Sequence, residues 1–199
     1  MCSIEAFFIV KGIRLIIGLG NPGDKYSKTR HNAGFWFIDE LARRYGASFK
    51  AESKFSGDVA KANIEGQPVW LLKPSTFMNR SGLAAHQISS FYKIPVGEIL
   101  VAYDELDLSP GIVRLKKSGG HGGHNGLRDL HAQISKEDIR LRFGIGHPGD
   151  RNKVADYVLS RPNQNDEIEI SNAIDRTLDV MDKIIVSDND RAMNILHTD

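Results

Sequence analysis

Apolar runs alternate with polar, glycine-containing stretches along the chain, which indicates strands alternating with helices. Short runs rich in Ile, Leu and Val are typical of buried strands, and apolar residues spaced by three or four positions indicate helices that cover a sheet. We expect strands at residues 13–19, 58–64, 68–72, 99–103, 111–117 and 141–145. We expect helices at residues 32–45, 81–92, 125–134, 153–159 and 167–186. This order predicts an α/β fold with a mixed sheet and helices on both faces.

Local signals support several of these boundaries. Glu65-Gly66-Gln67 predicts a hairpin turn between the second and third strands. Ser81 is expected to cap the second helix, and Gly46 to end the first. The last helix carries an apolar stripe that should cover the sheet: Ile170, Ala173, Ile174, Leu178, Met181 and Ile185. Because no composition break or internal repeat interrupts the pattern, we expect residues 13–199 to form one domain.

Residues 1–12 precede this pattern, and we expect them to be an N-terminal extension. The run Ile4–Val10 is apolar but too short to span a bilayer, and no basic residues precede it as they would in a secretion signal. The chain has one cysteine, Cys2, so an intrachain disulfide is impossible, which favours a reducing compartment.

The formal net charge of the 199 residues is only +1, but the basic residues are unevenly distributed. Residues 110–155 contain nine Lys or Arg and four Asp or Glu, whereas residues 156–199 form the acidic part of the chain. A local basic patch suits a partner that carries phosphate groups, although a solvated surface of mixed charge would explain the composition equally well.

Four polar motifs follow the apolar strand-like runs. They lie within Gly18–Gly34 (GLGNPG and TRHNAG), Pro74–Gly82, Tyr103–Gly111 and Gly119–Gly126. The first three motifs place Asn21, Asn79 and Asp104 just after the carboxyl end of a predicted strand. Since ligands of open α/β sheets bind at that edge, we expect these side chains to share one site.

His31 is the candidate general base of this site. We expect it at a helix N-terminus, where the helix dipole and neighbouring Arg30 would disfavour its protonation. Asp104 is the best candidate to hold the imidazole tautomer and to stabilise the imidazolium. No nucleophile elbow is present and Cys2 lies in the extension, so direct attack by water is the simplest chemistry.

Two motifs could also indicate a cofactor, but the sequence supports these interpretations less well than a His31 general base. Gly18–Gly23 matches the dinucleotide-binding pattern G-x-G-x-x-G, but its last glycine opens a turn rather than a helix. Asp104, Asp107, His121 and His124 could form a divalent-metal site, but no third His or Cys lies close to them in the sequence. We therefore expect neither a nucleotide cofactor nor a metal.

The glycine-rich motif Gly119–Gly126 runs into a predicted helix, so its backbone N–H groups could hold an anion or an oxyanion; a packing turn is the alternative. Asn125, at its end, could accept a hydrogen bond from a water while donating one to an oxyanion. Phe77 and Met78 could contact a peptide or a base, although core packing would also explain them.

Taken together, these motifs closely resemble bacterial-type peptidyl-tRNA hydrolases. LRFGIGHPGD (Leu141–Asp150) extends the resemblance, which covers about residues 13–196 in the family's order. The resemblance implies a monomeric cytoplasmic enzyme without a metal or organic cofactor. It also implies a single three-layer α/β/α domain around a mixed, twisted sheet. The implied reaction is hydrolysis of the ester between a peptide and the 3′-terminal ribose of tRNA.

The resemblance also implies roles for individual residues. His31 would activate water, Asp104 would orient His31, and Asn21 and Asn79 would hold the peptide and ester groups. Asn125 would fix the water and the oxyanion. The cleft would be lined by Tyr26, Phe77 and Met78, and the 5′-phosphate of the tRNA would be held by Lys116 and Arg142.

Residues 1–12 and a short loop at 135–140 depart from the family pattern, and the latter affects the expected tRNA contacts. The main alternative is a relative that binds RNA without catalysis. Because His31 and Asp104 are both present, we favour the enzyme.

Overall fold

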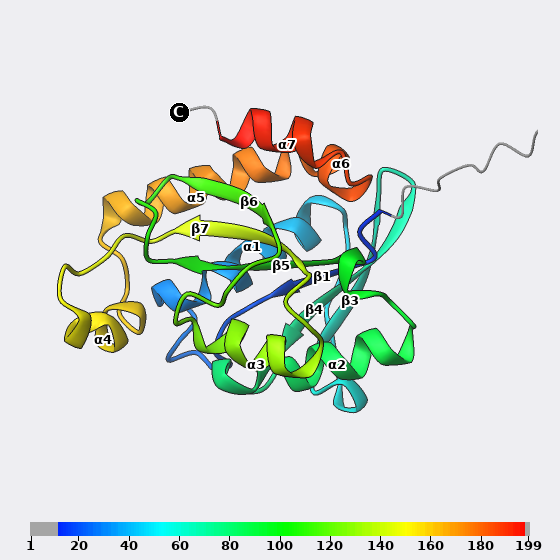
Figure 1. Ribbon diagram of the computed structural model, residues 1–199, viewed down its shortest axis with the longest axis horizontal. Coiled ribbons are helices and arrows are strands. Elements are labelled where there is room, and N and C mark those ends of the chain that lie inside the picture. The colour runs from blue at the N-terminus through cyan, green and yellow to red at the C-terminus, as the bar shows by residue number, and fades with distance from the viewer. Residues whose placement is uncertain (1–11, 198–199) are drawn as a thin grey trace, which may run out of the picture.

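The computed structural model describes residues 12–197, whose strands form one seven-stranded sheet in the order β2-β3-β4-β1-β5-β7-β6 (Figure 1). The strands are β1 (Leu15–Gly18), β2 (Lys50–Glu52), β3 (Gly57–Ile64), β4 (Gln67–Pro74), β5 (Ile99–Glu105), β6 (Val113–Lys117) and β7 (Ile139–Gly144). The central neighbours β4, β1, β5 and β7 are parallel, whereas β2, β3 and β6 pair antiparallel to their neighbours. The predicted mixed sheet is therefore confirmed.

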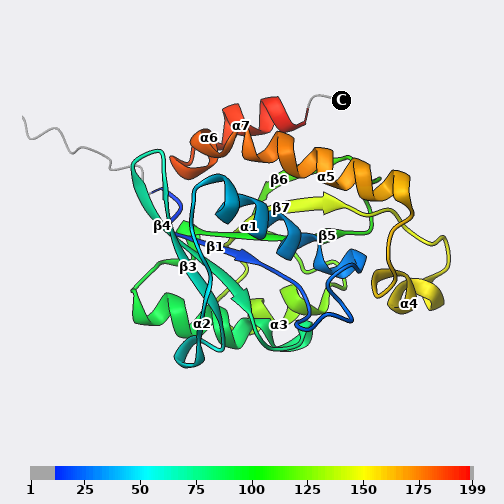
Figure 2. The same ribbon diagram turned by 180° about the vertical axis from the view of Figure 1, so that it is seen from behind.

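Helices cover both faces of the sheet, which gives the predicted three layers. The helices are α1 (Ala33–Arg44), α2 (Ser81–Phe91), α3 (Asn125–Gln133), α4 (Val154–Val158), α5 (Gln164–Leu178), α6 (Met181–Ile185) and α7 (Asn189–Leu196). One face packs against α1, α5, α6 and α7, and the other packs against α2 and α3 (Figures 1 and 2). Helix α4 lies beyond the end of β7 (Figure 1), and its residue Val158 belongs to the core on the side of α1 and α5.

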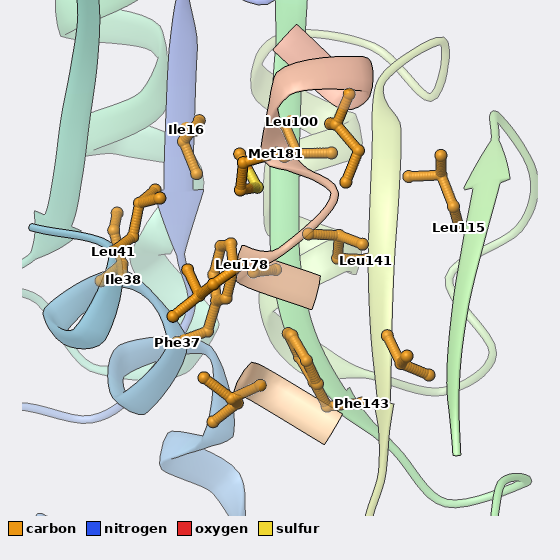
Figure 3. Close-up of a cluster of buried hydrophobic side chains, with 14 of the residues drawn as sticks. Ile16, Phe37, Ile38, Leu41, Leu100, Leu115, Leu141, Phe143, Leu178 and Met181 are labelled. Carbon is orange, nitrogen blue, oxygen red and sulfur yellow. The ribbon is translucent and has the colours of Figure 1, made fainter. Parts of the chain in front are cut away.

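The larger of the two apolar cores lies between the sheet and α1, α5 and α6. Figure 3 shows Phe37 and Leu41 of α1 opposite Phe143 of β7 and Leu178 of α5. The rings of Phe37 and Phe143 are 5.3 Å apart. Every residue of the predicted apolar stripe on residues 170–185 is buried. Since a fully buried Leu, Ile or Phe contributes roughly 1.5–3 kcal/mol, this face holds the C-terminal helices on the sheet.

The structure differs from the sequence prediction in the C-terminal region. The helix predicted at 167–186 is divided into α5 and α6 by Asp179 and Val180. Apolar periodicity continues across the break, so it could not mark it. Strand β2 and helix α7 were not predicted: β2 has three residues, of which Lys50 and Ala51 are exposed, so it lacks the alternation that reveals a strand.

The prediction that Ser81 caps the second helix is wrong. Ser81 is the first residue inside α2, and Arg80 occupies the capping position without a side-chain hydrogen bond. The Ser81 hydroxyl instead donates to the Met78 carbonyl oxygen. Ser81 therefore stabilises the turn before α2 rather than the N–H groups of the helix.

Two glycines of the first motif allow α1 to approach the sheet closely. A Cβ atom on Gly18 would collide with the carbonyl oxygen of Gly34, and a Cβ atom on Gly20 would lie 2.5 Å from the Phe35 ring. These glycines therefore serve backbone packing, which is the simpler alternative to a dinucleotide site.

The first described residues of the chain pack against the C-terminal helices. The N–H of Ile13 donates to the Ile185 carbonyl oxygen, so the chain enters β1 beside α6. Residues 1–11 of the predicted extension lie outside the described residues. Within residues 12–197, none of the helices has the length and apolar character needed to cross a membrane.

Candidate active site

Three ionisable side chains meet at the carboxyl edge of the parallel strands. His31 comes from a 3-10 turn (Arg30–Asn32) that follows β1, Asp104 comes from the end of β5, and His124 precedes α3. All three line a cleft of about 600 Å³. The other residues of its wall are Glu105, Leu106, Asp107, His121, Gly122, Gly123, Asn125, Arg128, His147, Arg151, Val154, Ala155 and Val158. The β5 end, the glycine-rich loop and α4 therefore enclose one site.

His31 and Asp104 form the predicted pair. His31 Nδ1 lies 2.9 Å from both carboxylate oxygens of Asp104, whose side chain is almost completely buried. An ionised carboxylate only accepts hydrogen bonds, so Nδ1 carries the hydrogen and donates it. In the neutral ring, Nε2 then carries the lone pair, and His31 can accept a proton there.

His124 is a second partner of Asp104. Its Nε2 lies 3.0 Å from Asp104 Oδ1, and its Nδ1 accepts a hydrogen bond from the N–H of Leu127 in the first turn of α3. Because Nδ1 accepts, the hydrogen of the neutral ring lies on Nε2, which donates to Asp104. Asp104 thus receives N–H groups from two imidazoles.

This arrangement shifts the pKa values of the pair in opposite directions. Burial alone would raise the pKa of Asp104, but His31 and His124 outweigh burial and hold it well below its usual range. Burial would lower the pKa of His31, but the charge of Asp104 and its hydrogen bond raise that pKa above the usual 6.5. The prediction that local effects would disfavour protonation of His31 is therefore wrong.

Arg30 does not act on His31 as predicted because its side chain points elsewhere. Its Nη1 donates to the hydroxyl of Ser160 at 2.8 Å and to the carbonyl oxygen of Arg161 at 3.0 Å. Its guanidinium also lies 4.1 Å from the centre of the Tyr157 ring. Arg30 therefore links the turn that carries His31 to the segment after α4.

Asn21 connects the first two motifs. Its side-chain Oδ1 accepts a hydrogen bond of 2.8 Å from the N–H of Met78. Its backbone N–H and C=O are both bonded to the side-chain amide of Asn32, each at 2.9 Å. With its Oδ1 used in this way, the Nδ2 group of Asn21 is the part of the amide that can donate to a ligand.

Of the remaining predicted residues of the site, Asn125 lines the cleft, whereas Tyr26, Phe77, Met78 and Asn79 are not among its lining residues. Asn125, the first residue of α3, is exposed and lines the cleft with His31. Met78 is buried, and its neighbour Asn79 is exposed in the same short turn. The rings of Tyr26 and Phe77 meet edge to face at 6.2 Å, and Phe77 is 57% exposed. The structure thus links Asn21 to the turn that carries Met78 and Asn79, and it places Asn125 in the same cleft as His31.

Lys116 and Arg142 share a face of the sheet edge. Lys116 on β6 pairs in register with Arg140 on β7, two residues from Arg142, so all three side chains point to the same face. Arg142 Nε donates to Glu105 Oε2 at 3.0 Å, and Glu105 follows Asp104 directly. The partly exposed Arg142 is therefore adjacent to the end of the strand that carries Asp104, whereas exposed Lys116 lies level with Arg140 and Val101, closer to the start of that strand.

The ligand atoms of His31, Asp104 and His124 lie within 4.8 Å of one another, so these three residues could hold a metal ion. The hydrogen bonds point to a different arrangement. The imidazole nitrogens that face Asp104 both carry hydrogens in this network, and a metal would have to displace both. The donor set therefore fits a hydrogen-bonded triad better than a metal centre.

Sequence reasoning missed three contributors: His124 as a partner of Asp104, Asn32 as the support of Asn21, and Arg140 as a link to the glycine-rich loop. His124 was considered only as a metal ligand, although its position immediately before a helix could have indicated a capping role. Arg140 carried no such signal because it was predicted to lie in the loop before the strand at 141–145, where a charged residue is normally exposed.

Known proteins resemble this chain over nearly its full length. The peptidyl-tRNA hydrolase family model matches residues 15–199. The peptidyl-tRNA hydrolase of Neisseria meningitidis serogroup A is 51% identical over 187 residues, which are 94% of this chain and 97% of that protein. That of Halorhodospira halophila is 51% identical over 185 residues, or 92% of this chain and 95% of that protein.

The fold agrees with this match. A crystal structure of peptidyl-tRNA hydrolase from Acinetobacter baumannii superimposes with a TM-score of 0.92 at 48% identity, and it covers 94% of this chain and 95% of that one. The chain therefore belongs to the peptidyl-tRNA hydrolase family.

Proposed function

We propose that this enzyme hydrolyses the ester between the peptide and the 3′-terminal ribose of peptidyl-tRNA with a water molecule activated by His31. One observation carries the proposal: the Nδ1–H of His31 is bonded to buried Asp104, so the lone pair of Nε2 is available at the cleft. Family membership supports the substrate class, and the triad supports the chemistry.

The proposed reaction proceeds in two proton transfers. Water attacks the ester carbonyl carbon while His31 Nε2 takes its proton, and ionised Asp104 stabilises the imidazolium. When the tetrahedral intermediate collapses, the C–O bond to the ribose breaks and His31 returns the proton to the leaving 3′ oxygen. The products are a peptide with a free carboxyl group and a tRNA with a free 3′ hydroxyl.

We assign stabilisation of the oxyanion to the start of α3. The Asn125 amide is exposed beside His31 and can donate to the developing negative charge or hold the attacking water. The N-terminus of α3 adds a favourable dipole at the same place. Hydrolysis of an ester demands less activation than that of an amide, so these groups suffice without a metal.

The asparagines would select a peptide over a single amino acid. Asn21 and Asn79 can bond the C=O and N–H groups of a peptide, and Tyr26, Phe77 and Met78 would supply apolar contact. A free aminoacyl ammonium lacks the acceptor and adds a charge, so its ester should be a poor substrate. N-acetylation of an aminoacyl-tRNA should therefore accelerate cleavage, and an equal rate for the two esters contradicts this assignment.

We assign binding of the tRNA 5′-phosphate to Lys116 and Arg142. Their shared face and the basic character of residues 110–155 support this assignment. We also propose that the protein acts as a cytoplasmic monomer, that residues 13–199 form its single domain, and that residues 1–12 are an extension outside the catalytic unit.

The decisive test is hydrolysis of N-acetyl-aminoacyl-tRNA in the presence of EDTA, with the intact protein compared with His31→Ala. Release of free tRNA by the intact protein alone is the expected result. If neither protein releases tRNA but both bind it, the family member is a binding protein rather than a hydrolase. Full activity in His31→Ala removes His31 from the mechanism.

A further inference from the structure

Asp138 is a buried acid outside the catalytic triad, and it lies close to the glycine-rich loop. Asp138 is fully buried beside β7, and Arg140, one residue into the strand, is 1% exposed. Arg140 Nε donates to Asp138 Oδ2 at 3.0 Å, and Nη2 lies 3.2 Å from Oδ1, so the ion pair uses both carboxylate oxygens. Burying such a pair costs desolvation, and the remaining donors of the guanidinium require partners.

Those donors reach the loop that carries the active-site residues. Nη1 donates to the carbonyl oxygen of Gly120 and Nη2 to that of Gly119, both at 2.7 Å. Nη2 also lies 2.7 Å from Nε2 of His131, which accepts because a guanidinium can only donate. Arg140 therefore ties together β7, the start of the loop and the body of α3.

Within the loop, the N–H groups of Gly123 and His124 both donate to His121, and these bonds shape its far half. The bonds from Arg140 hold its first half, at Gly119 and Gly120. Gly119, Gly122 and Gly123 adopt positive φ values of 130°, 57° and 85°. Glycine is permissive at such angles, so the chain between β6 and α3 depends on its hydrogen bonds for order. At its far end, His124 donates to Asp104, and Asn125 follows directly.

Each end of the loop is thus held by a different buried aspartate. Asp138 acts through Arg140 at Gly119 and Gly120, and Asp104 bonds His124 directly. A shift of the first end would move the second because fewer than five residues separate Gly120 from His124. To bond Asp138, Gly119 and Gly120 at once, a side chain needs several N–H donors in a planar fork, and lysine cannot supply this geometry.

We propose that Arg140 is a positioning residue for catalysis: it holds the glycine-rich loop so that His124 bonds Asp104 and Asn125 faces the reacting ester. This inference rests on the proposed function of His31 and Asp104. It assigns Arg140 a different task from its neighbour Arg142, whose proposed partner is the tRNA phosphate. Loss of Arg140 should affect the chemical step rather than tRNA binding.

The test compares Arg140→Gln and Arg140→Lys with Thr177→Ala. Thr177 is fully buried in α5 on the opposite face of the sheet, so its substitution lowers stability without contact with the loop. Arg140→Gln should lower kcat about 30- to 100-fold, since a displacement near 1 Å costs about 100-fold, with KM within about twofold. Arg140→Lys should fall between Arg140→Gln and the wild type.

The second measurement is the proton NMR signal of the His124 Nε2–H, which its hydrogen bond to Asp104 should protect from exchange. We expect this signal in the wild type and in Thr177→Ala, and its loss or rapid exchange in Arg140→Gln. A purely structural role predicts that kcat falls only with the folded fraction, as in Thr177→Ala, and that the His124 signal persists. That outcome would overturn the proposal.

Two controls keep the result interpretable. If Arg140→Gln does not fold, the same comparison of kcat and the His124 signal is made with Arg140→Lys, whose retained charge still pairs with Asp138. His31→Ala is assayed in parallel: full activity in that variant contradicts the proposed function, whereas the His124 signal still reports whether Arg140 holds the loop.

Discussion

His31 and His131 each lie next to a buried aspartate, yet their pKa values move in opposite directions. Asp104 raises the pKa of His31. Burial and the positive charge of Arg140 lower the pKa of His131, and they outweigh Asp138, whose Oδ1 lies 3.7 Å from His131 Nε2. The difference lies in Arg140, which already neutralises Asp138, whereas the hydrogen-bond partners of Asp104 within residues 12–197 are the imidazoles of His31 and His124.

This contrast separates a reactive site from a structural one. In the Asp104 cluster the partners of the carboxylate are titratable, and one of them keeps a lone pair at the cleft. In the Asp138 cluster the guanidinium of Arg140 donates to the carboxylate, to the carbonyl oxygens of Gly119, Gly120 and Lys136, and to His131, and it has no lone pair to offer a substrate. The first arrangement can exchange a proton during a reaction, and the second can only hold its neighbours in place.

Removal of the base should have the largest effect. His31→Ala should lower kcat about 10³- to 10⁴-fold, because a positioned general base supplies up to about 10⁴-fold and water alone would replace it. The fold and the affinity for tRNA should stay nearly unchanged. Single-turnover hydrolysis measures the rate, with His86→Ala, an exposed histidine on α2, as the matched control.

The cluster of Asp138 and Arg140 should also contribute strongly to stability. Asp138→Asn leaves the Arg140 charge buried without its counterion, so the free energy of unfolding should fall by about 3–5 kcal/mol. Urea denaturation measures it, and Glu137→Gln, an exposed neighbouring acid, should change stability by less than about 0.5 kcal/mol. Equal losses in the two variants would show that the pair contributes nothing beyond surface charge.

The pH dependence should follow the raised pKa of His31. The base must be neutral, so kcat/KM should increase with pH through an apparent pKa above 6.5. In Asp104→Asn the carboxylate charge is gone, so this acid limb should move to lower pH while the maximal rate falls about 10²- to 10⁴-fold. An unmoved limb in Asp104→Asn would mean that Asp104 does not control the protonation of His31.

The same pair also affects stability in a defined pH window. Asp104 has a lowered pKa, so its contribution is present above its ordinary value of 3.8 and is lost as pH falls through the folded-state pKa. His31 has a raised pKa, so its contribution is present below 6.5 and is lost as pH rises through the folded-state pKa. The free energy of unfolding of the wild type should therefore exceed that of Asp104→Asn most between pH 3.8 and pH 6.5.

The smallest effect is expected at the proposed phosphate contact. Lys116→Ala should weaken tRNA binding by about tenfold at low salt and reduce the slope of log Kd against log salt by about one. Filter binding over a range of salt concentrations measures both. Lys117→Ala is the matched control, because adjacent strand residues point to opposite faces. The same loss in both variants would indicate a general electrostatic effect.

The sequence alone determined the order of elements and most of the site. Apolar runs and helical stripes predicted the α/β layers because burial leaves a periodic record in the chain. Polar residues directly after strands predicted that Asn21, Asn79 and Asp104 would share one site, because parallel strands end at one edge. Of these three, Asp104 lines the cleft, together with His31 and Asn125. The contact between His31 and Asp104 is present as predicted.

Only the tertiary structure decided which groups face one another. Arg30, beside His31 in the sequence, turns toward Ser160, whereas His124, 20 residues from Asp104, donates to it. The direction of the His31 pKa shift followed from these contacts and not from its neighbours in the chain. The sequence indicates that Arg140 is an exposed charge. In the structure it is buried, because Asp138 and the carbonyl oxygens of Gly119 and Gly120 surround it. Periodicity records which side of an element is buried, but hydrogen-bond partners depend on packing between distant segments.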